Sequence, residues 1–130
     1  MISVTNAKYP AEELKARSKQ FAIRIVRLSQ ALPNAREAWV IGKQVLRSGT
    51  SVAANYRAAC RARSKSEFIA KIGVVVEEID EAIFWLELLV ETGIVSKRRM
   101  SKLLAEANEL MAIFAASQHT ARTRSFSMDQ

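Results

Sequence analysis

Apolar residues recur every three or four positions along most of the chain, with charged residues between them. This spacing is typical of amphipathic helices that bury one face. We expect helices over about residues 10–32, 35–63, 65–92 and 97–117. Residues 118–130 lack the periodicity and are expected to form a flexible tail. The pattern predicts an all-α, antiparallel, up-down-up-down four-helix bundle in a single domain over residues 1–130.

The second helix contains a run of weak helix formers from Ser48 to Ser51. Gly49 alone costs about 1 kcal/mol relative to alanine in a helix interior. The three-four spacing of apolar residues nevertheless continues from Ala38 to Ala59, so we expect one unbroken helix. Gly49 is then interpreted as a site of close helix packing or of a bend, with a small-molecule pocket as the alternative.

Capping patterns mark the starts of two helices. Asn34 with Glu37, and Ser64 with Glu67, match the capping box, in which a short polar side chain and a glutamate satisfy free backbone amides. At the other end of the third helix, Gly93 stands where a helix commonly stops. These signals predict short connections and therefore antiparallel neighbours.

The third helix is apolar on more than one side, which a monomeric bundle has difficulty covering. Its widened apolar side includes Phe84, Trp85 and Leu88. We expect these three residues at a subunit interface, because aromatic side chains are enriched at the centres of such interfaces.

Charge is strongly uneven along the sequence. The formal net charge is +7, with a pI near 10.0. Residues 1–65 contain 13 basic and 3 acidic residues, whereas residues 66–130 contain 7 basic and 10 acidic residues. Opposite blocks of this kind help to fix which helices are neighbours, within a subunit or between subunits, and allow head-to-tail self-assembly.

Two groups of basic residues are candidates for contact with RNA or DNA. Phosphate-backbone binding would use such residues without reading bases, and would be sensitive to salt. The second group crowds a helix N-terminus, where cations are unfavourable. We interpret it first as an ordinary solvated surface, with an external anionic partner as the alternative that this placement suggests. The candidates are Arg57, Arg61, Arg63 and Lys65 in the first group, and Lys97, Arg98, Arg99 and Lys102 in the second.

Catalytic motifs are sparse. The only histidine, His119, lies in the expected tail, and Cys60 is interpreted as a small buried residue. Glu77, Glu78 and Glu81 lie one turn apart, but the glutamate-histidine pairs of a di-iron bundle are missing. No glycine-rich phosphate loop is present. We therefore expect no enzyme activity, no metal site and no cofactor.

A third hypothesis places an enzyme or ligand-carrier site on the polar face from Ser48 to Asn55, together with Glu77 or Glu81. The alternative is purely structural. Polar side chains on facing helices usually satisfy one another, and Arg47 or Arg57 would then pair with the acids.

Features of cellular location are few. One cysteine cannot form an internal disulfide, and the sequence opens with no signal-peptide pattern. Charges interrupt every long apolar stretch, so no transmembrane span is expected. The expectation is a cytoplasmic protein with no membrane partner.

The segment from Leu46 to Val95 carries a set of residues in fixed order and spacing. They are Arg47-Ser48-Gly49-Thr50-Ser51, Ala54-Asn55-Tyr56-Arg57-Ala58-Ala59, Phe68, Lys71-Ile72, Glu81 and Trp85-Leu86-Glu87-Leu88. In these residues the chain resembles the 23S rRNA-intervening-sequence family of four-helix bundle proteins. At Ala58, many members carry an acidic residue instead.

The resemblance implies a bundle that assembles into a ring, commonly a pentamer, with no established enzymatic activity. Related accessory proteins of diversity-generating retroelements interact with a reverse transcriptase and with nucleic acid. We therefore expect a ring-shaped homo-oligomer that serves as a non-enzymatic scaffold of unknown molecular role, with a protein partner. The alternative is an accessory protein that binds the backbone of RNA or DNA.

Overall fold

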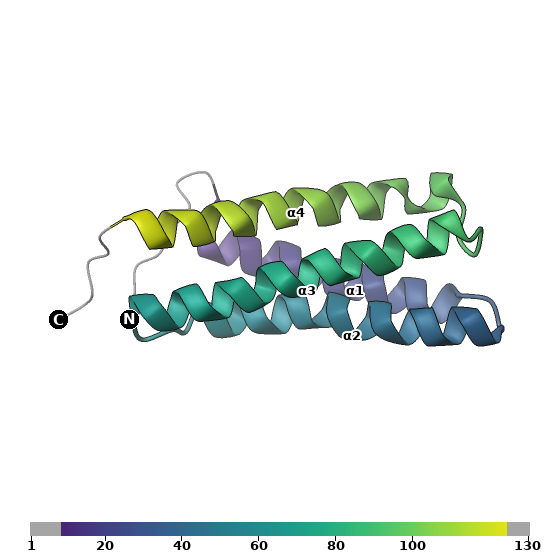
Figure 1. The fold of residues 1–130 in the computed structure, drawn as a ribbon, viewed down its shortest axis with the longest axis horizontal. Coiled ribbons are helices and arrows are strands. Elements are labelled where there is room, and N and C mark those ends of the chain that lie inside the picture. Colours follow the sequence, from purple (N-terminus) through teal and green to yellow (C-terminus); the bar gives the residue numbers. More distant parts are fainter. Residues whose placement is uncertain (1–8, 125–130) are drawn as a thin grey trace.

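A computed structural model describes residues 9–124 of the chain. These residues form four helices and no strand: α1 Ala11–Ala31, α2 Arg36–Ala59, α3 Lys65–Glu91 and α4 Lys97–Thr123. The helices run alternately up and down as long rods side by side (Figure 1). The predicted all-α, antiparallel four-helix bundle is confirmed.

The connections are short, so each helix packs on its neighbour in sequence. α2 lies between α1 and α3, α3 packs on α4, and the contact between α1 and α4 is the least extensive. Arg17 of α1 spans this last contact, with its Nη2 2.7 Å from Glu106 Oε1 and 3.1 Å from Glu109 Oε1. The hydrogen bond to Glu106 raises the pKa of Arg17. An ion pair thus links the helices that share the smallest packed surface.

Two of the helix starts use side-chain caps. Ser64 Oγ accepts a hydrogen bond from Glu67 N at 3.1 Å, and Ser96 Oγ accepts one from Arg99 N at 3.2 Å. The capping box expected at Asn34 is wrong, because Ala35 is the N-cap of α2 and forms no side-chain cap. The amide of Ala35 instead donates to Pro33 O at 2.9 Å, which delays the start of the helix by one residue.

Two expected helix ends also differ from the structure. α2 stops at Ala59 rather than at residue 63, because Arg61 N and Ala62 N each bond three residues back, at 3.0 Å, in a tight turn. α4 continues to Thr123, so the expected tail over 118–130 is wrong for residues 118–123. Ala121 is 0 % exposed, and burial against the bundle holds this last stretch helical. The remainder of that tail, 125–130, lies outside the described residues.

The core runs the whole length of the bundle and draws on all four helices. The rings of Tyr56 on α2 and Phe114 on α4 pack with their centroids 4.9 Å apart, across the bundle interior. Full burial of a side chain of this kind contributes about 1.5–3 kcal/mol. The largest fully buried side chains are Phe21, Phe114, Leu14, Ile25, Ile72, Ile79, Leu86, Leu89, Met100, Leu110, Val45 and Val52.

α2 is unbroken through Gly49, as predicted, and the reason is its neighbour α1. A Cβ atom at Gly49 would lie 2.8 Å from Ile25 Cγ1 and 2.9 Å from Ile25 Cγ2. These atoms are attached directly to the Cβ of a branched side chain and have little room to move. Glycine therefore lets α1 approach α2 at this point, which confirms the interpretation of Gly49 as a close-packing site.

We predict that Gly49→Ala destabilises the fold even though alanine is the better helix former. Ile25 is fully buried and cannot move aside, so the clash should cost about 2–3 kcal/mol, the upper part of the usual range for overpacking. This outweighs the gain in helix propensity of about 1 kcal/mol. The measurement is urea unfolding followed by circular dichroism at one protein concentration.

Gly73→Ala is the matched control. Its Cβ would meet only the terminal Nε2 of Gln118, at 2.9 Å, and that flexible end can move aside. This variant should be neutral or more stable than the wild type. Equal effects of the two substitutions would contradict the close-packing account.

Candidate interaction surfaces

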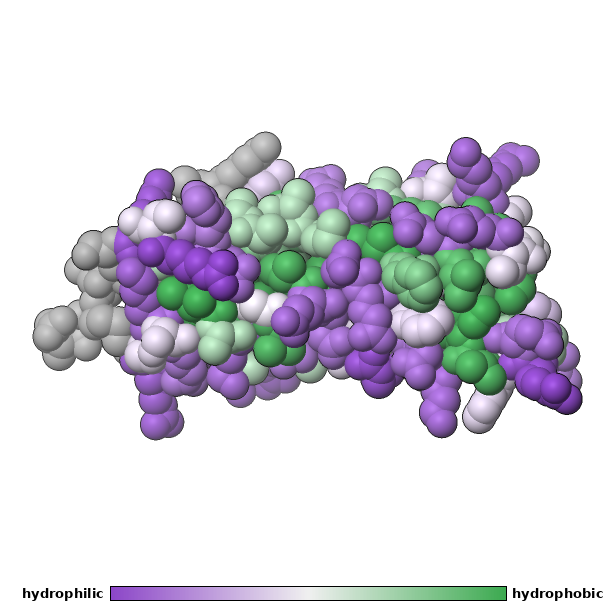
Figure 2. Space-filling model, in the orientation of Figure 1, coloured by the Kyte–Doolittle hydropathy of each residue, from purple (hydrophilic) through white to green (hydrophobic). Residues whose placement is uncertain are grey.

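The outer side of α3 exposes the residues that were expected at an interface. Phe84 is 55 % exposed, and Trp85 and Leu88 are half-buried. Val40 of α2 is 50 % exposed, and the antiparallel register set by Arg47 and Glu81 places it beside Leu88. We call Val40, Phe84, Trp85 and Leu88 the apolar patch. Figure 2 shows hydrophobic surface gathered over the C-terminal half of α3 and the adjacent part of α2.

The aromatic side chains of the patch are held in place. The rings of Phe84 and Trp85 meet edge to face, with centroids 4.9 Å apart. Trp85 Nε1 donates a hydrogen bond to Glu81 Oε2 at 3.0 Å. The patch is therefore a preorganised surface, and little side-chain freedom remains to be lost when it is covered.

A polar cluster joins α2 to α3 beside the patch. Arg47 Nη1 lies 3.3 Å from Glu78 Oε1, and Arg47 Nη2 donates to Glu81 Oε2. The hydrogen bonds from Trp85 and from Arg47 lower the pKa of Glu81, and the bond to Glu81 raises the pKa of Arg47. The expected pairing of Arg47 with the acids of α3 is present. Arg57 forms no ion pair with another described residue.

The polar face considered for a ligand site is occupied by bonds within α2 itself. Ser48 Oγ donates to Gln44 O at 2.7 Å, Thr50 Oγ1 to Leu46 O at 2.7 Å, and Asn55 Nδ2 to Ser51 O at 2.8 Å. These side chains therefore bond the backbone of their own helix, and not polar side chains of a facing helix as the structural alternative expected.

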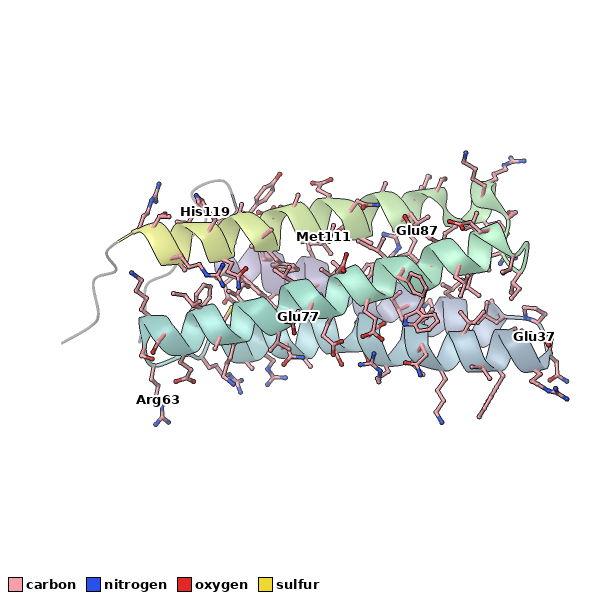
Figure 3. The ribbon with its side chains drawn as sticks, viewed as in Figure 1. Glu37, Arg63, Glu77, Glu87, Met111 and His119 are labelled. Carbon is pink, nitrogen blue, oxygen red and sulfur yellow. The ribbon has the colours of Figure 1, made fainter. Side chains whose placement is uncertain are left out.

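The reactive side chains do not form a recognisable catalytic group among residues 9–124. Burial raises the pKa of the half-buried Cys60 thiol, the reverse of what activates a nucleophile. Burial also raises the pKa of Tyr56. His119, expected in a tail, lies exposed on α4 (Figure 3). In the same range, no three His, Cys, Asp or Glu side chains are grouped to hold a metal ion.

The two groups of candidate nucleic-acid contacts lie far apart. Arg57, Arg61, Arg63 and Lys65 surround the turn from α2 to α3, where Figure 3 labels Arg63. Lys97, Arg98, Arg99 and Lys102 begin α4 at the opposite end of the bundle (Figure 1). The 27 residues of α3 between them span about 40 Å. One compact binding site cannot contain both groups.

The structure adds two cations that the sequence analysis missed. Arg122 and Arg124 close α4 at the same end as the first group, and Lys65 Nζ donates to Arg124 O at 2.8 Å. We call this region the basic end: Arg57, Arg61, Arg63, Lys65, Arg122 and Arg124. The signal that could have found them is the continued three-four spacing of Phe114, Ser117 and Ala121.

A groove opens at the other end of the α1–α2 pair. It has a volume of about 450 Å³, and Leu32, Trp39, Gly42 and Lys43 are among the residues that line it. Trp39 is 67 % exposed, and Lys43 Nζ lies 5.2 Å from the centroid of its ring. The sequence analysis did not single out Trp39, which stands off the apolar stripe of its helix.

Fold and surfaces together define a four-helix bundle protein whose distinctive features lie on its exterior. No helix within residues 9–124 has the length and the hydrophobicity that crossing a membrane requires. The model of the 23S rRNA-intervening sequence protein family matches residues 12–116, and the chain belongs to this family. The resemblance stated from the sequence is thus confirmed.

A solved structure supports the same assignment. The chain is similar to a protein of unknown function from the S23 ribosomal protein family of Bacteroides thetaiotaomicron, at 34% sequence identity and a TM-score of 0.79. The similarity covers 85% of this chain and 98% of that chain. No curated protein matches the chain.

We predict that Glu81→Gln makes stability less dependent on pH below about pH 5. A carboxylate with a lowered pKa contributes stability above its unfolded pKa and loses that contribution as the pH falls through its folded pKa. The variant should be slightly less stable at pH 7, by under about 1 kcal/mol for a surface pair, and should converge with the wild type in acid. Thermal unfolding from pH 3 to pH 7 measures this.

Glu77→Gln is the control, because it removes the same charge one turn away from a carboxylate without a described bond. If the melting temperatures of the two variants fall by the same amount between pH 7 and pH 3, the cluster of Arg47, Glu81 and Trp85 does not stabilise the fold.

Proposed function

We propose that the protein is a non-enzymatic scaffold that assembles from several copies of itself. The apolar patch is the observation that carries this proposal. Contiguous exposed apolar surface with a polar rim is typical of a protein–protein contact, and the pairs of Arg47 with Glu78 and Glu81 supply such a rim. Aromatic residues near the centre of such a patch contribute most to binding.

The assembly we propose is a ring, with the pentamer implied by the family resemblance as its subunit number. A cyclic assembly of this kind needs two different surfaces on each copy that fit each other. The proposed location is the cytoplasm, because the one cysteine of the chain is a half-buried free thiol.

Phe84→Ser should weaken self-association. Removing an aromatic anchor from an interface costs about 1–4 kcal/mol, so the dissociation constant between subunits should rise at least about fivefold. Light scattering after size-exclusion chromatography, over a range of protein concentrations, measures the subunit number.

The matched control is Val74→Ser, which alters a 39 % exposed residue on the same helix, outside the patch. It should assemble as the wild type does. A wild type that stays monomeric at tens of micromolar would overturn the scaffold proposal. If the two variants assemble equally well, the apolar patch is not the surface through which the subunits assemble.

A second candidate function is binding to the phosphate backbone of RNA or DNA, favoured by the basic end. Three separate segments bring six cations to one end of the bundle. When these cations bind phosphates, the counterions condensed on the nucleic acid are released, which favours binding at low salt. The candidate is an accessory role alongside a protein partner, and its binding would depend on shape and charge more than on base sequence.

We predict that Arg61→Glu with Arg63→Glu weakens binding to duplex DNA and to structured RNA. Losing two phosphate contacts should reduce the slope of log K against log salt by about two. Filter binding from 50 to 300 mM salt measures the slope. Arg98→Glu with Arg99→Glu, at the other end, is the control and should change it less. Wild-type protein that binds neither nucleic acid at 50 mM salt would exclude this candidate.

A further inference from the structure

The acidic residues of α3 divide into two sets with different surroundings. Glu78 and Glu81 face α2 and bond Arg47. Glu67, in the first turn, accepts a hydrogen bond from Arg63 N at 3.3 Å. The other four acids are exposed and form no hydrogen bond or ion pair with another described residue. They follow one side of the helix at steps of three and four, with Phe84 at the centre. We call this row the acidic stripe: Glu77, Asp80, Phe84, Glu87 and Glu91. Glu77 and Glu87 lie at successive points along α3 in Figure 3.

α2 carries a complementary row on its solvent-facing side, next to Arg47. Lys43 and Arg57 are exposed, and Thr50 lies midway between them. The hydroxyl of Thr50 is bonded within its own helix, and its neighbour Ala54 is exposed and small. We call Lys43, Thr50, Ala54 and Arg57 the basic stripe. Lys43 lines the groove with Ser29 and Leu32, which places this end of the stripe next to α1.

The two stripes have the same spacing. Lys43, Thr50 and Arg57 are seven residues apart, as are Glu77, Phe84 and Glu91. Seven residues advance a helix by about 10.5 Å and return the side chain to nearly the same side. A large apolar side chain between two acids therefore matches a shallow, small-residue site between two cations.

We infer that the partner of the acidic stripe is the basic stripe of a second copy of this chain. Phe84 of one copy packs against Thr50 and Ala54 of the next, while the acids at either side meet Lys43 and Arg57. The inference rests on the proposed scaffold function and names the two surfaces that the assembly uses. Small residues let two helices approach closely, and charge pairs at the edge of the contact select the partner and the register.

The placement of the stripes fixes the kind of assembly. They lie on different helices, so each copy that uses its acidic stripe still has a free basic stripe for another copy. Such a heterologous contact propagates, giving a ring where the rotation closes and a filament where it does not. A second copy is favoured over an unrelated protein because both halves of the match occur in one chain at equal spacing.

The test reverses the charge on each stripe separately and then on both. Glu77→Lys with Glu91→Lys places cations on both stripes, and Lys43→Glu with Arg57→Glu places acids on both. Each pair should raise the dissociation constant at least about tenfold. The variant with all four substitutions carries the charges exchanged and should assemble as the wild type does. Light scattering at 50 mM salt provides the readout.

Two control pairs make the same changes in net charge elsewhere on the surface. They are Glu13→Lys with Glu37→Lys, and Lys97→Glu with Lys102→Glu. Both should leave assembly intact. Circular dichroism checks that every variant folds. As a measurement free of substitutions, wild-type assembly should weaken between 50 and 500 mM salt, because salt screens exposed charges.

The possible results distinguish the pairing of the stripes from the scaffold function on which it rests. A wild type that is monomeric overturns both. A wild type that assembles, with reversals no more damaging than the controls or with no recovery in the fourfold variant, overturns the pairing of the stripes and leaves the scaffold standing on another surface.

Discussion

Ile25 of α1 lies over Gly49 of α2 so closely that no side chain fits between the two helices at that point. This close approach fixes the position of α2, which packs against both α1 and α3. With α1 held on one side, Arg47 is directed to the other, where it bonds Glu78 and Glu81. α2 therefore meets Glu78 and Glu81 of α3 and leaves Phe84 exposed.

The acidic residues of α3 form one block in the sequence but two sets with different surroundings in the structure. Glu78 and Glu81 bond Arg47 within the subunit, and Glu81 also accepts a hydrogen bond from Trp85. The exposed acids have no such partner among the described residues, and they surround Phe84. An exposed aromatic ring among carboxylates adds little to the stability of a monomer. The contact with a second copy that we infer would give that row a role outside the subunit.

Much of the fold could be predicted from the sequence, and the failures have identifiable causes. The spacing of apolar residues predicted the four helices, and it correctly predicted that α2 continues through Gly49. Periodicity reflects which residues are buried, and burial outweighs the low helix propensity of a single glycine. The end of α4 was missed because Ala121 is small and Gln118 is polar, so neither reads as core. Gln118 lies against Gly73 of α3, which is far away in the sequence. The sequence analysis also found the two groups of cations, but the distance between them follows from the length of α3 in the structure.

Charge along the bundle axis links the two proposed roles. The free acids lie along the middle and far half of α3, whereas the basic end lies where α2 finishes and α3 begins. Copies joined side by side through their stripes would neutralise the acids at every contact. They would leave exposed the five cations of each basic end other than Arg57, which belongs to the basic stripe. In a closed ring all copies point the same way along the axis, so these ends would gather on one rim. A single basic end binds phosphate weakly and without base readout, but several on one rim act together at high effective concentration. Assembly would then convert a modest positive charge into a multivalent surface, and the salt dependence of nucleic-acid binding would follow the assembled state.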